Sequence, residues 1–173
     1  KSFYLLSQEL LSRSSGPVLG LVRDRRAALI VVHGVAASGE LGRDPRLQRA
    51  MENTDWLWQH LKGVPAFRAL LRAVESRFYQ PVSWQRPMLD LGCGDGHFAQ
   101  STFINVPPPD VGVDPALPSL HEAQHRLVYS LPVQAVGDRL PFADGQFGSV
   151  MSNSVLEHIP QVDRVVAELA RVL

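Results

Sequence analysis

The spacing of apolar residues along the chain changes character near Pro87. Before it, apolar side chains recur mostly every three or four residues, which is the period of an amphipathic helix. One such stretch runs through Leu47, Met51, Trp56, Leu57 and Leu61 and ends at Gly63. Another begins at Val64-Pro65 and ends before Pro81, because proline cannot continue a helix. Its expected buried face consists of Phe67, Leu70, Leu71, Val74 and Phe78.

Two earlier stretches complete the first half. Phe3, Leu6, Leu10 and Leu11 repeat at helical spacing before the break at Gly16-Pro17. Residues 18–37 contain a continuous apolar run that suits a buried helix or a buried strand equally, and we favour the helix. Residues 1–85 are therefore expected to form a helical N-terminal cap or accessory region. Trp56, Trp58 and Phe67 could form a lid over a site there, but at helical spacing they more often belong to a core.

After Pro87, short apolar runs alternate with helical patterns. Strands are expected at 88–92, 110–114, 132–136 and 147–152, with helices at 95–103, 117–129 and from 162 to the end. This alternation is typical of βαβ units on a parallel sheet. Residues 86–173 are thus predicted to be a Rossmann-like α/β domain with an incomplete sheet of about four strands.

Composition narrows the class of protein. The chain is 45% apolar and 20% charged, as in an ordinary globular domain, and no apolar run reaches the roughly 20 residues of a membrane span. The single Cys93 excludes a disulfide within the chain, which favours a reducing compartment and a cytoplasmic location. The chain begins at Lys1 and ends inside a helical pattern, so we expect it to be part of a longer protein.

Charge is distributed unevenly although the net charge is zero. Residues 1–86 hold 13 Lys and Arg against 7 Asp and Glu, whereas residues 87–173 hold 4 against 10. A basic half could attract acidic partners. Because the basic residues are scattered, we favour two halves that pack as one neutral body.

The most informative stretch is Met-Leu-Asp-Leu-Gly-Cys-Gly-Asp-Gly at 88–96. An apolar strand carrying Asp90 leads into glycines 92, 94 and 96, which permit positive φ and close approach of a ligand to the main chain. A nicotinamide dinucleotide fingerprint requires a third glycine where this chain has His97. The loop therefore predicts a compact polar ligand at a strand end but argues against a dinucleotide.

Three more polar groups follow the ends of later strands. Asp114 lies where α/β sheets place an acid on the ribose hydroxyls. Asp138 closes the next strand, where it could accept a hydrogen bond from an exocyclic amine such as that of adenine, and Ser152-Asn-Ser-Val-Leu-Glu-His158 closes the last. Open α/β sheets bind ligands at the carboxyl ends of their strands. The shared order and spacing predict one site more strongly than any single motif.

These motifs together resemble the class I S-adenosylmethionine-dependent methyltransferases, in the small-molecule branch. The resemblance covers residues 86–173 and implies that S-adenosylmethionine is the cofactor. It implies that the glycine loop is formed by Asp90, Gly92, Cys93, Gly94 and Gly96, with Asp114 and Pro115 at the ribose. It places Asp138 and the backbone of Arg139 and Leu140 at the adenine, Asn153 and Ser154 along the cofactor edge, and His158 as a catalytic residue facing the methyl group.

The sequence departs from this family's pattern at several points. Gly148 stands where the family usually has Asp, and the chain stops before the family's fifth strand. An incomplete sheet would leave the strand at 147–152 as an exposed edge, through which the chain could form a homo-oligomer.

A competing motif lies on the helix expected at 117–129. His121-Glu-Ala-Gln-His125 has the H-E-x-x-H form of a zinc protease helix, with Leu120, Ala123 and Leu127 as its buried stripe. No suitably spaced downstream histidine follows it. Zinc-dependent hydrolysis is therefore a distant third hypothesis for the function, and we expect no metal site.

Cys93 has two readings. The expected helix N-terminus beside it would lower the pKa of its thiol, although a small residue that fits the turn is the more economical explanation.

The favoured function is methyl transfer from S-adenosylmethionine to a small-molecule acceptor. A non-catalytic cofactor-binding or interaction module is the second reading. We expect neither a membrane span nor a nucleic-acid partner, because Asn153 is followed by Ser-Val rather than by the motif that grips a flipped base.

Overall fold

The structure is a computed structural model of residues 1–173. It describes residues 53–80, 82 and 84–173 in full, together with the backbone of residues 18–24 and 27–33. The helix expected near Phe3–Leu11 and the start of the one expected from Leu47 lie outside the described residues.

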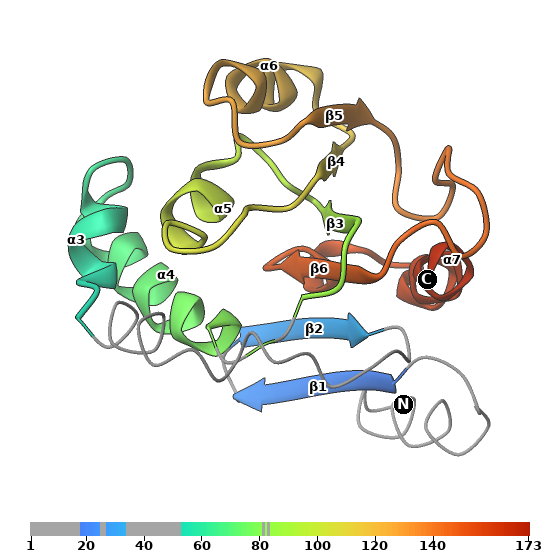
Figure 1. The fold of residues 1–173 in the computed structure, drawn as a ribbon, viewed down its shortest axis with the longest axis horizontal. Helices are drawn as coiled ribbons and strands as arrows, with labels where there is room; N and C mark the ends of the chain where they lie inside the picture. The colour runs from blue at the N-terminus through green and yellow to red at the C-terminus, as the bar shows by residue number, and fades with distance from the viewer. Residues whose placement is uncertain (1–17, 25–26, 34–52, 81, 83) are drawn as a thin grey trace.

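The described residues form a six-stranded sheet in the order β1-β2-β6-β3-β4-β5 (Figure 1). Four strands are parallel: β3 (Met88–Leu91), β4 (Val111–Asp114), β5 (Leu131–Gln134) and β6 (Ser149–Asn153). Leu89 in β3 lies opposite Val111 on one side and Val150 on the other. The α/β fold expected for residues 86–173 is confirmed.

The preference for a helix at residues 18–37 is wrong over the part that the structure describes. β1 (Val18–Asp24) and β2 (Ala27–His33) form an antiparallel hairpin, and β2 pairs antiparallel with β6. The β-branched run at Ile30, Val31 and Val32 suits a strand, and the open edge of β6 supplies the hydrogen-bonding partners that decide the choice. β6 is therefore not the exposed edge that we expected as an oligomer contact. The outer strands of the described sheet are β1 and β5.

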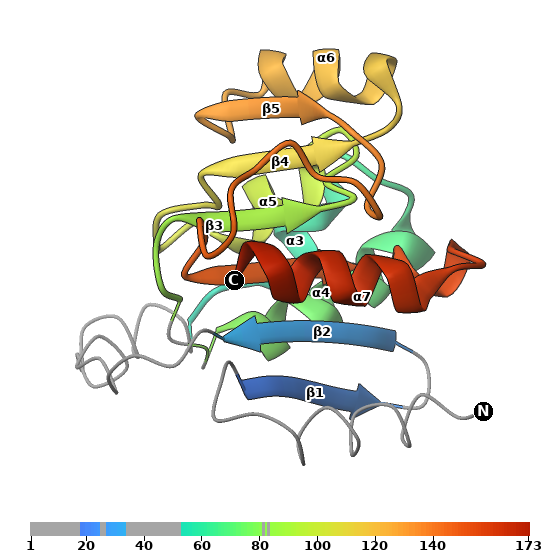
Figure 2. The ribbon, with the colours of Figure 1, turned by 90° about the vertical axis from the view of Figure 1, so that its right-hand side faces the viewer.

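Helices cover both faces of the parallel strands (Figures 1 and 2). On one face lies α7 (Val162–Val172), whose Val165, Leu169 and Val172 pack against β3, β4 and β6. On the other lie α3 (Trp56–Leu61), α4 (Ala66–Tyr79), α5 (His97–Thr102) and α6 (Leu117–His125). Apolar cores on the two faces hold the strand ends in fixed positions relative to one another.

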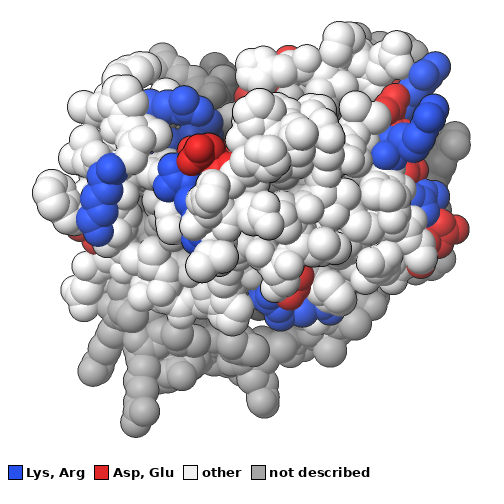
Figure 3. Space-filling view, turned by 90° about the horizontal axis from the view of Figure 1, so that it is seen from above, with Lys and Arg blue, Asp and Glu red and all other residues white. Residues whose placement is uncertain are grey.

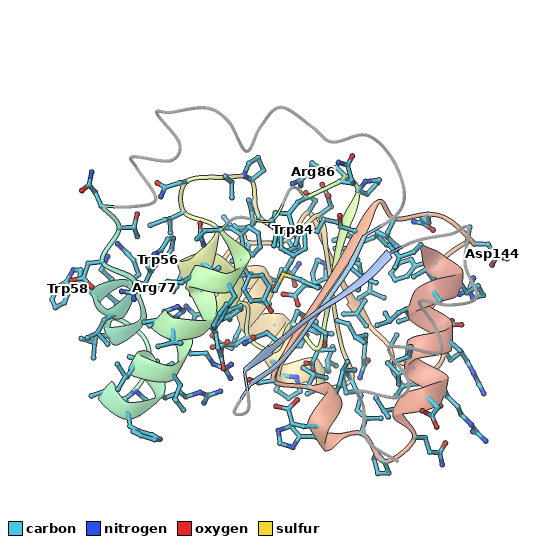
Figure 4. The ribbon with its side chains drawn as sticks, turned by 90° about the horizontal axis from the view of Figure 1, so that it is seen from below. Trp56, Trp58, Arg77, Trp84, Arg86 and Asp144 are labelled. Atoms are coloured by element: carbon cyan, nitrogen blue, oxygen red, sulfur yellow. The ribbon has the colours of Figure 1, made fainter. Side chains whose placement is uncertain are left out.

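Helix α4 forms where it was expected, but its buried face differs. Phe67 is 74% exposed, and Leu70, Leu71 and Val74 are also exposed, whereas Ala69, Ala73, Ser76 and Tyr79 are buried. The small residues let α4 approach α3 and α5 closely, so tertiary packing overrides the apolar pattern. Of the two tryptophans on α3, Trp56 is buried and Trp58 points outward at the edge of the molecule (Figure 4).

A buried polar chain joins these three helices. The His60 Nε2 atom lies 2.8 Å from the Ser76 hydroxyl, which lies 2.7 Å from the Thr102 hydroxyl. The His60 Nδ1 atom lies 3.2 Å from His97 Nε2. Burial, followed by the nearby His97 and Arg72, lowers the pKa of His60 to about 4. His97, the residue in the third-glycine position, thus has a packing role between α3 and α5.

Gly148 has a steric explanation. A Cβ atom built there would lie 2.8 Å from the Cβ of Gln85 and 3.0 Å from the carbonyl oxygen of Arg86. The aspartate that the family usually carries at this point would therefore displace the segment that leads into β3.

Candidate cofactor pocket

One pocket of about 480 Å³ lies at the carboxyl ends of the four parallel strands. Every one of the four loops identified from the sequence contributes to it. Its lining is made of Leu91, Gly92, Val113, Asp114, Pro115, Ala135, Val136, Gly137, Asp138, Ser154, Val155, His158, Ile159, Pro160, Gln161 and Val165. The convergence of these loops, which the sequence predicted, is observed.

The glycine loop is pinned to the neighbouring strand. The amides of Gly92 and Cys93 donate to the carbonyl of Val113 at 2.7 and 3.0 Å. Gly92 and Gly94 have φ of +74° and +54°, in the left-handed region that favours glycine. A Cβ on Gly92 would collide with the Val155 side chain, whereas a Cβ on Gly94 would meet open space. Gly92 is thus required by packing, and Gly94 leaves the main chain accessible.

Asp114 links the end of β4 to the glycine loop. Its Oδ2 atom accepts a hydrogen bond from the Gly94 amide at 3.0 Å, and its Oδ1 atom accepts one from the Ala116 amide at 2.8 Å. The carboxylate lines the pocket, as does Pro115. Because a carboxylate has about four acceptor positions, Asp114 can hold the loop and still bind the hydroxyls of a ligand.

Asp90 lies beneath the loop rather than in the pocket lining. It is 3% exposed, and its Oδ2 atom accepts a hydrogen bond from the Tyr129 hydroxyl at 2.7 Å. Burial raises the pKa of Asp90 to about 7, the Tyr129 bond opposes that shift, and the negative Asp114 adds to it. The two carboxylates of this region therefore differ. Asp114 lines the pocket, whereas Asp90 is buried outside the lining and binds Tyr129.

The raised pKa of Asp90 predicts how stability changes with pH. In the unfolded chain this carboxyl ionises near pH 3.8, whereas in the folded protein it holds its proton to about pH 7. Its contribution to stability is therefore full below pH 4 and is lost as pH rises to 7, by an amount of the order of 4 kcal/mol. Asp90→Asn should remove this loss, as measured by urea unfolding at pH 5, 6, 7 and 8.

Comparing the wild-type protein with Asp90→Asn isolates the effect of Asp90 on the pH dependence of stability. The buried His60 titrates in an overlapping pH range in both, with the opposite sign, because its pKa is lowered. The difference between the wild-type and Asp90→Asn curves therefore carries the signal. Parallel curves from pH 5 to 8 would contradict the raised pKa.

The loop that follows β5 matches the expectation from the sequence only in part. Asp138 lines the pocket, but Arg139 and Leu140 do not. Their amides donate within the protein, that of Arg139 to the Val136 carbonyl at 3.1 Å and that of Leu140 to Glu168 Oε1 at 2.7 Å. The backbone amides expected at the adenine are thus already bonded, which leaves Asp138 as the polar group of this loop.

The side chains at the end of β6 and just after it point in two directions. Ser154 and His158 line the pocket, and the His158 side chain is 77% exposed, 4.0 Å from Glu157. Asn153 turns away from it: its Nδ2 atom donates to Glu75 Oε2 at 2.9 Å, and its Oδ1 atom accepts from the Tyr79 hydroxyl at 3.2 Å. Asn153 therefore binds helix α4 instead of lining the cofactor edge.

Sequence reasoning missed the apolar half of the pocket. Its walls include Ala135, Val136, Val155, Ile159 and Val165. Residues 135–137 directly follow β5, and the position next to a predicted carboxyl end was a usable signal for them. Ile159, Pro160 and Gln161 carried no such signal, because their place depends on the turn between β6 and α7.

Cys93 and the histidine pair lie outside the pocket lining. Burial, reinforced by Asp90 and Asp114, raises the pKa of the Cys93 thiol, which supports the favoured interpretation of a small residue that fits the turn over that of a reactive thiol. His121 and His125 are exposed on α6, and no group of three metal-ligating side chains occurs among the described residues. In the stripe that flanks them, Leu120 and Ala123 are buried, but Leu127 is 86% exposed.

Charges on the described surface are mixed. Figure 3 shows Lys and Arg in small groups beside Asp and Glu rather than in one continuous patch. Arg126 pairs with Asp95 at 3.1 Å, and Arg171 pairs with Glu168 and Asp144 at 2.8 and 2.6 Å. Within the part of the chain that the structure describes, no helix is long and apolar enough to cross a membrane.

A parallel α/β sheet with a glycine loop and carboxylates at its strand ends is typical of a nucleotide-binding domain. Residues 89–173 match a family described as a methyltransferase domain. This match, together with similarity to curated methyltransferases, supports a class I S-adenosylmethionine-dependent methyltransferase for this part of the chain. The resemblance to the class I methyltransferases is confirmed, and the small-molecule branch stays a prediction.

Relatives from mycobacteria agree with this assignment. An uncharacterized methyltransferase of Mycobacterium sp. (strain KMS) is 38% identical over 87 residues, which is 50% of this chain and 34% of the relative. One from Mycolicibacterium gilvum is 40% identical over 88 residues, or 49% and 34%. The matched part thus spans about a third of the length of these relatives.

Among solved structures, the YcgJ protein of Bacillus subtilis is 27% identical with a TM-score of 0.47, over 59% of this chain and 45% of that one. A Thermotoga maritima SAM-dependent methyltransferase, titled a possible histamine N-methyltransferase, is 20% identical with a TM-score of 0.49, over 73% and 54%.

Proposed function

We propose that this chain binds S-adenosylmethionine in the pocket at the ends of β3, β4, β5 and β6, and transfers the methyl group to a small-molecule acceptor. One observation carries the proposal: Asp114 and Asp138, from neighbouring strands, line the same pocket as Gly92. Two carboxylates in this arrangement suit the donors of an adenosine, namely the ribose hydroxyls and the exocyclic amine.

The rest of the lining fits the other parts of the cofactor. Ala135, Val136, Ile159 and Val165 offer apolar contact to the faces of an adenine ring. Gly92 brings the main chain of the glycine loop to the pocket wall, where it is available to the polar amino-acid end. The pocket volume of about 480 Å³ lies within the common range for small-molecule sites.

The chemistry required of the protein is modest. The bound cofactor supplies a methyl group on a positively charged sulfur, which makes that carbon electrophilic. The residues of the pocket orient the reactants in line and exclude water. His158, at the pocket and largely exposed, is placed to accept a proton from an acceptor that must lose one.

Calorimetry with S-adenosylmethionine and S-adenosylhomocysteine tests cofactor binding. We expect one binding site for each, and a folded protein that binds neither would contradict the proposal. Label from methyl-labelled S-adenosylmethionine should then appear in the small-molecule fraction of a cell extract rather than in its protein or nucleic acid. Binding without any transfer would favour a non-catalytic cofactor-binding module.

A pair of histidine variants tests the role of His158. His158→Gln should slow turnover and leave cofactor affinity unchanged. His121→Gln replaces an exposed histidine outside the pocket lining and is the matched control.

A further inference from the structure

Helix α4 grips the end of β6 through a group of side-chain bonds. The Nη1 atom of Arg72 donates to the Ser154 hydroxyl at 2.7 Å and to Glu75 Oε2 at 2.5 Å. The same Glu75 oxygen accepts from Asn153 Nδ2 at 2.9 Å, and Glu75 Oε1 accepts from the Ser154 hydroxyl at 3.4 Å. The Tyr79 hydroxyl donates to Asn153 Oδ1 at 3.2 Å. We call these five residues the α4 clamp.

The Arg72–Glu75 pair of the clamp is largely shielded from solvent, and Arg72 also lies against α5. The side chains of Arg72 and Glu75 are only 16% and 12% exposed, so their charge-assisted bonds are weakly screened. The guanidinium carbon of Arg72 also lies 5.6 Å from the centre of the Phe98 ring, on α5. Arg72, Glu75 and Tyr79 follow one another at helical spacing, so one face of α4 supplies the whole grip.

The clamp acts on a part of the chain that borders the cofactor pocket. Ser154 has a φ of +55°, a left-handed conformation that a residue with a side chain keeps only where its surroundings hold it. Ser154 and the next residue, Val155, line the pocket. Val155 also packs so closely on Gly92 that no Cβ fits between them. The position of residues 153–155 therefore sets the distance between the last strand and the glycine loop.

We propose that Arg72 and Glu75 are positioning residues for the cofactor pocket. Through Asn153 and Ser154 they hold the wall at Val155 against the glycine loop. Cofactor affinity would then depend on α4, which lies outside the family-matched residues 89–173. This inference rests on the proposed function, because the measured ligand is the cofactor product.

A double-mutant cycle on S-adenosylhomocysteine binding tests the inference. Arg72→Ala should raise the Kd by about tenfold, Ser154→Ala should raise it by less, and the double variant should bind no more weakly than Arg72→Ala. A merely structural role of Arg72 would give additive effects. Arg77→Ala, an exposed arginine on the same helix (Figure 4), is the matched control and should bind as the wild type does.

The outcomes separate the two proposals. A wild-type protein that does not bind contradicts the proposed function and this inference with it. Wild-type binding with an unchanged Kd in Arg72→Ala, or with additive effects in the cycle, overturns the inference alone. If Arg72→Ala does not fold, Glu75→Gln keeps the side-chain size and should still raise the Kd about threefold. An unchanged Kd in that variant would also overturn the inference.

Discussion

Replacing Asp114 by Ala should weaken binding of S-adenosylhomocysteine by about two orders of magnitude. The variant loses the carboxylate placed for the ribose hydroxyls, and two charge-assisted bonds together contribute about 3 kcal/mol. It also loses the acceptor that holds the Gly94 amide at 3.0 Å, so the glycine loop is released at the same time. Calorimetry at constant pH and ionic strength measures the change in Kd directly.

A second carboxylate provides the control for this experiment. Asp144 is exposed beside α7, outside the pocket lining, and pairs with Arg171 (Figure 4). Asp144→Ala should therefore leave the Kd within about twofold of the wild type, since it removes only an exposed ion pair. Equal affinities for Asp114→Ala and the wild type would remove Asp114 from the cofactor site.

Replacing Gly92 by Ala should both destabilise the fold and abolish cofactor binding. The added Cβ would lie within 2.9 Å of three carbons of the Val155 side chain, at a φ of +74° that L residues rarely adopt. The conformational cost of about 1–2 kcal/mol adds to an overpacking cost of about 1–3 kcal/mol. Urea unfolding should show a loss of about 3 kcal/mol, and calorimetry should show no binding.

A substitution at Gly145 separates the conformational cost of a positive φ from the cost of overpacking against Val155. It has a φ of +65°, but a Cβ built there meets no atom within 4 Å. Gly145→Ala should therefore carry only the conformational cost of about 1–2 kcal/mol, and it should bind the cofactor normally. Equal losses of stability in the two variants would show that Val155 yields to the new methyl group.

The parallel half of the fold was predictable because its signals are local. Each of β3, β4, β5 and β6 contains apolar residues close to turn-forming residues such as Gly, Pro, Asp, Asn or Ser, and each intervening helix has its own periodicity. Since parallel strands end at the same edge of a sheet, the residues after them had to converge. Local patterns were therefore sufficient to assign Gly92, Asp114, Asp138 and His158 to one pocket.

The N-terminal half was less predictable because its signals depend on partners. The run Ala27–Val32 suits either a helix or a strand, and only the pairing of β2 with β6 decides between them. On α4, the large apolar residues are exposed while Ala69, Ala73 and Ser76 are buried. Close helix packing and a polar network selected the small face, which periodicity cannot reveal.

The candidate site shows the same difference between what local motifs predict and what tertiary packing decides. Sequence placed Asp90, Arg139, Leu140 and Asn153 at the cofactor by motif alone. The structure buries Asp90 beneath Tyr129, bonds the amides of Arg139 and Leu140 internally, and turns Asn153 towards Glu75. A motif records which residue follows a strand, but the direction of its side chain depends on what packs beside it.

By itself, the sequence determined the class of this protein, the succession of its parallel strands along the chain and the carboxylates at their ends. The strands and the carboxylates follow from periodicity and turn chemistry, which act over a few neighbouring residues, and the class follows from the resemblance of the combined motifs to a known family. The tertiary structure alone decided that β1 and β2 extend the sheet and that α4 binds residues at the wall of the pocket. Both depend on contacts between segments distant in sequence, where hydrogen-bonding partners and packing space outweigh local preference.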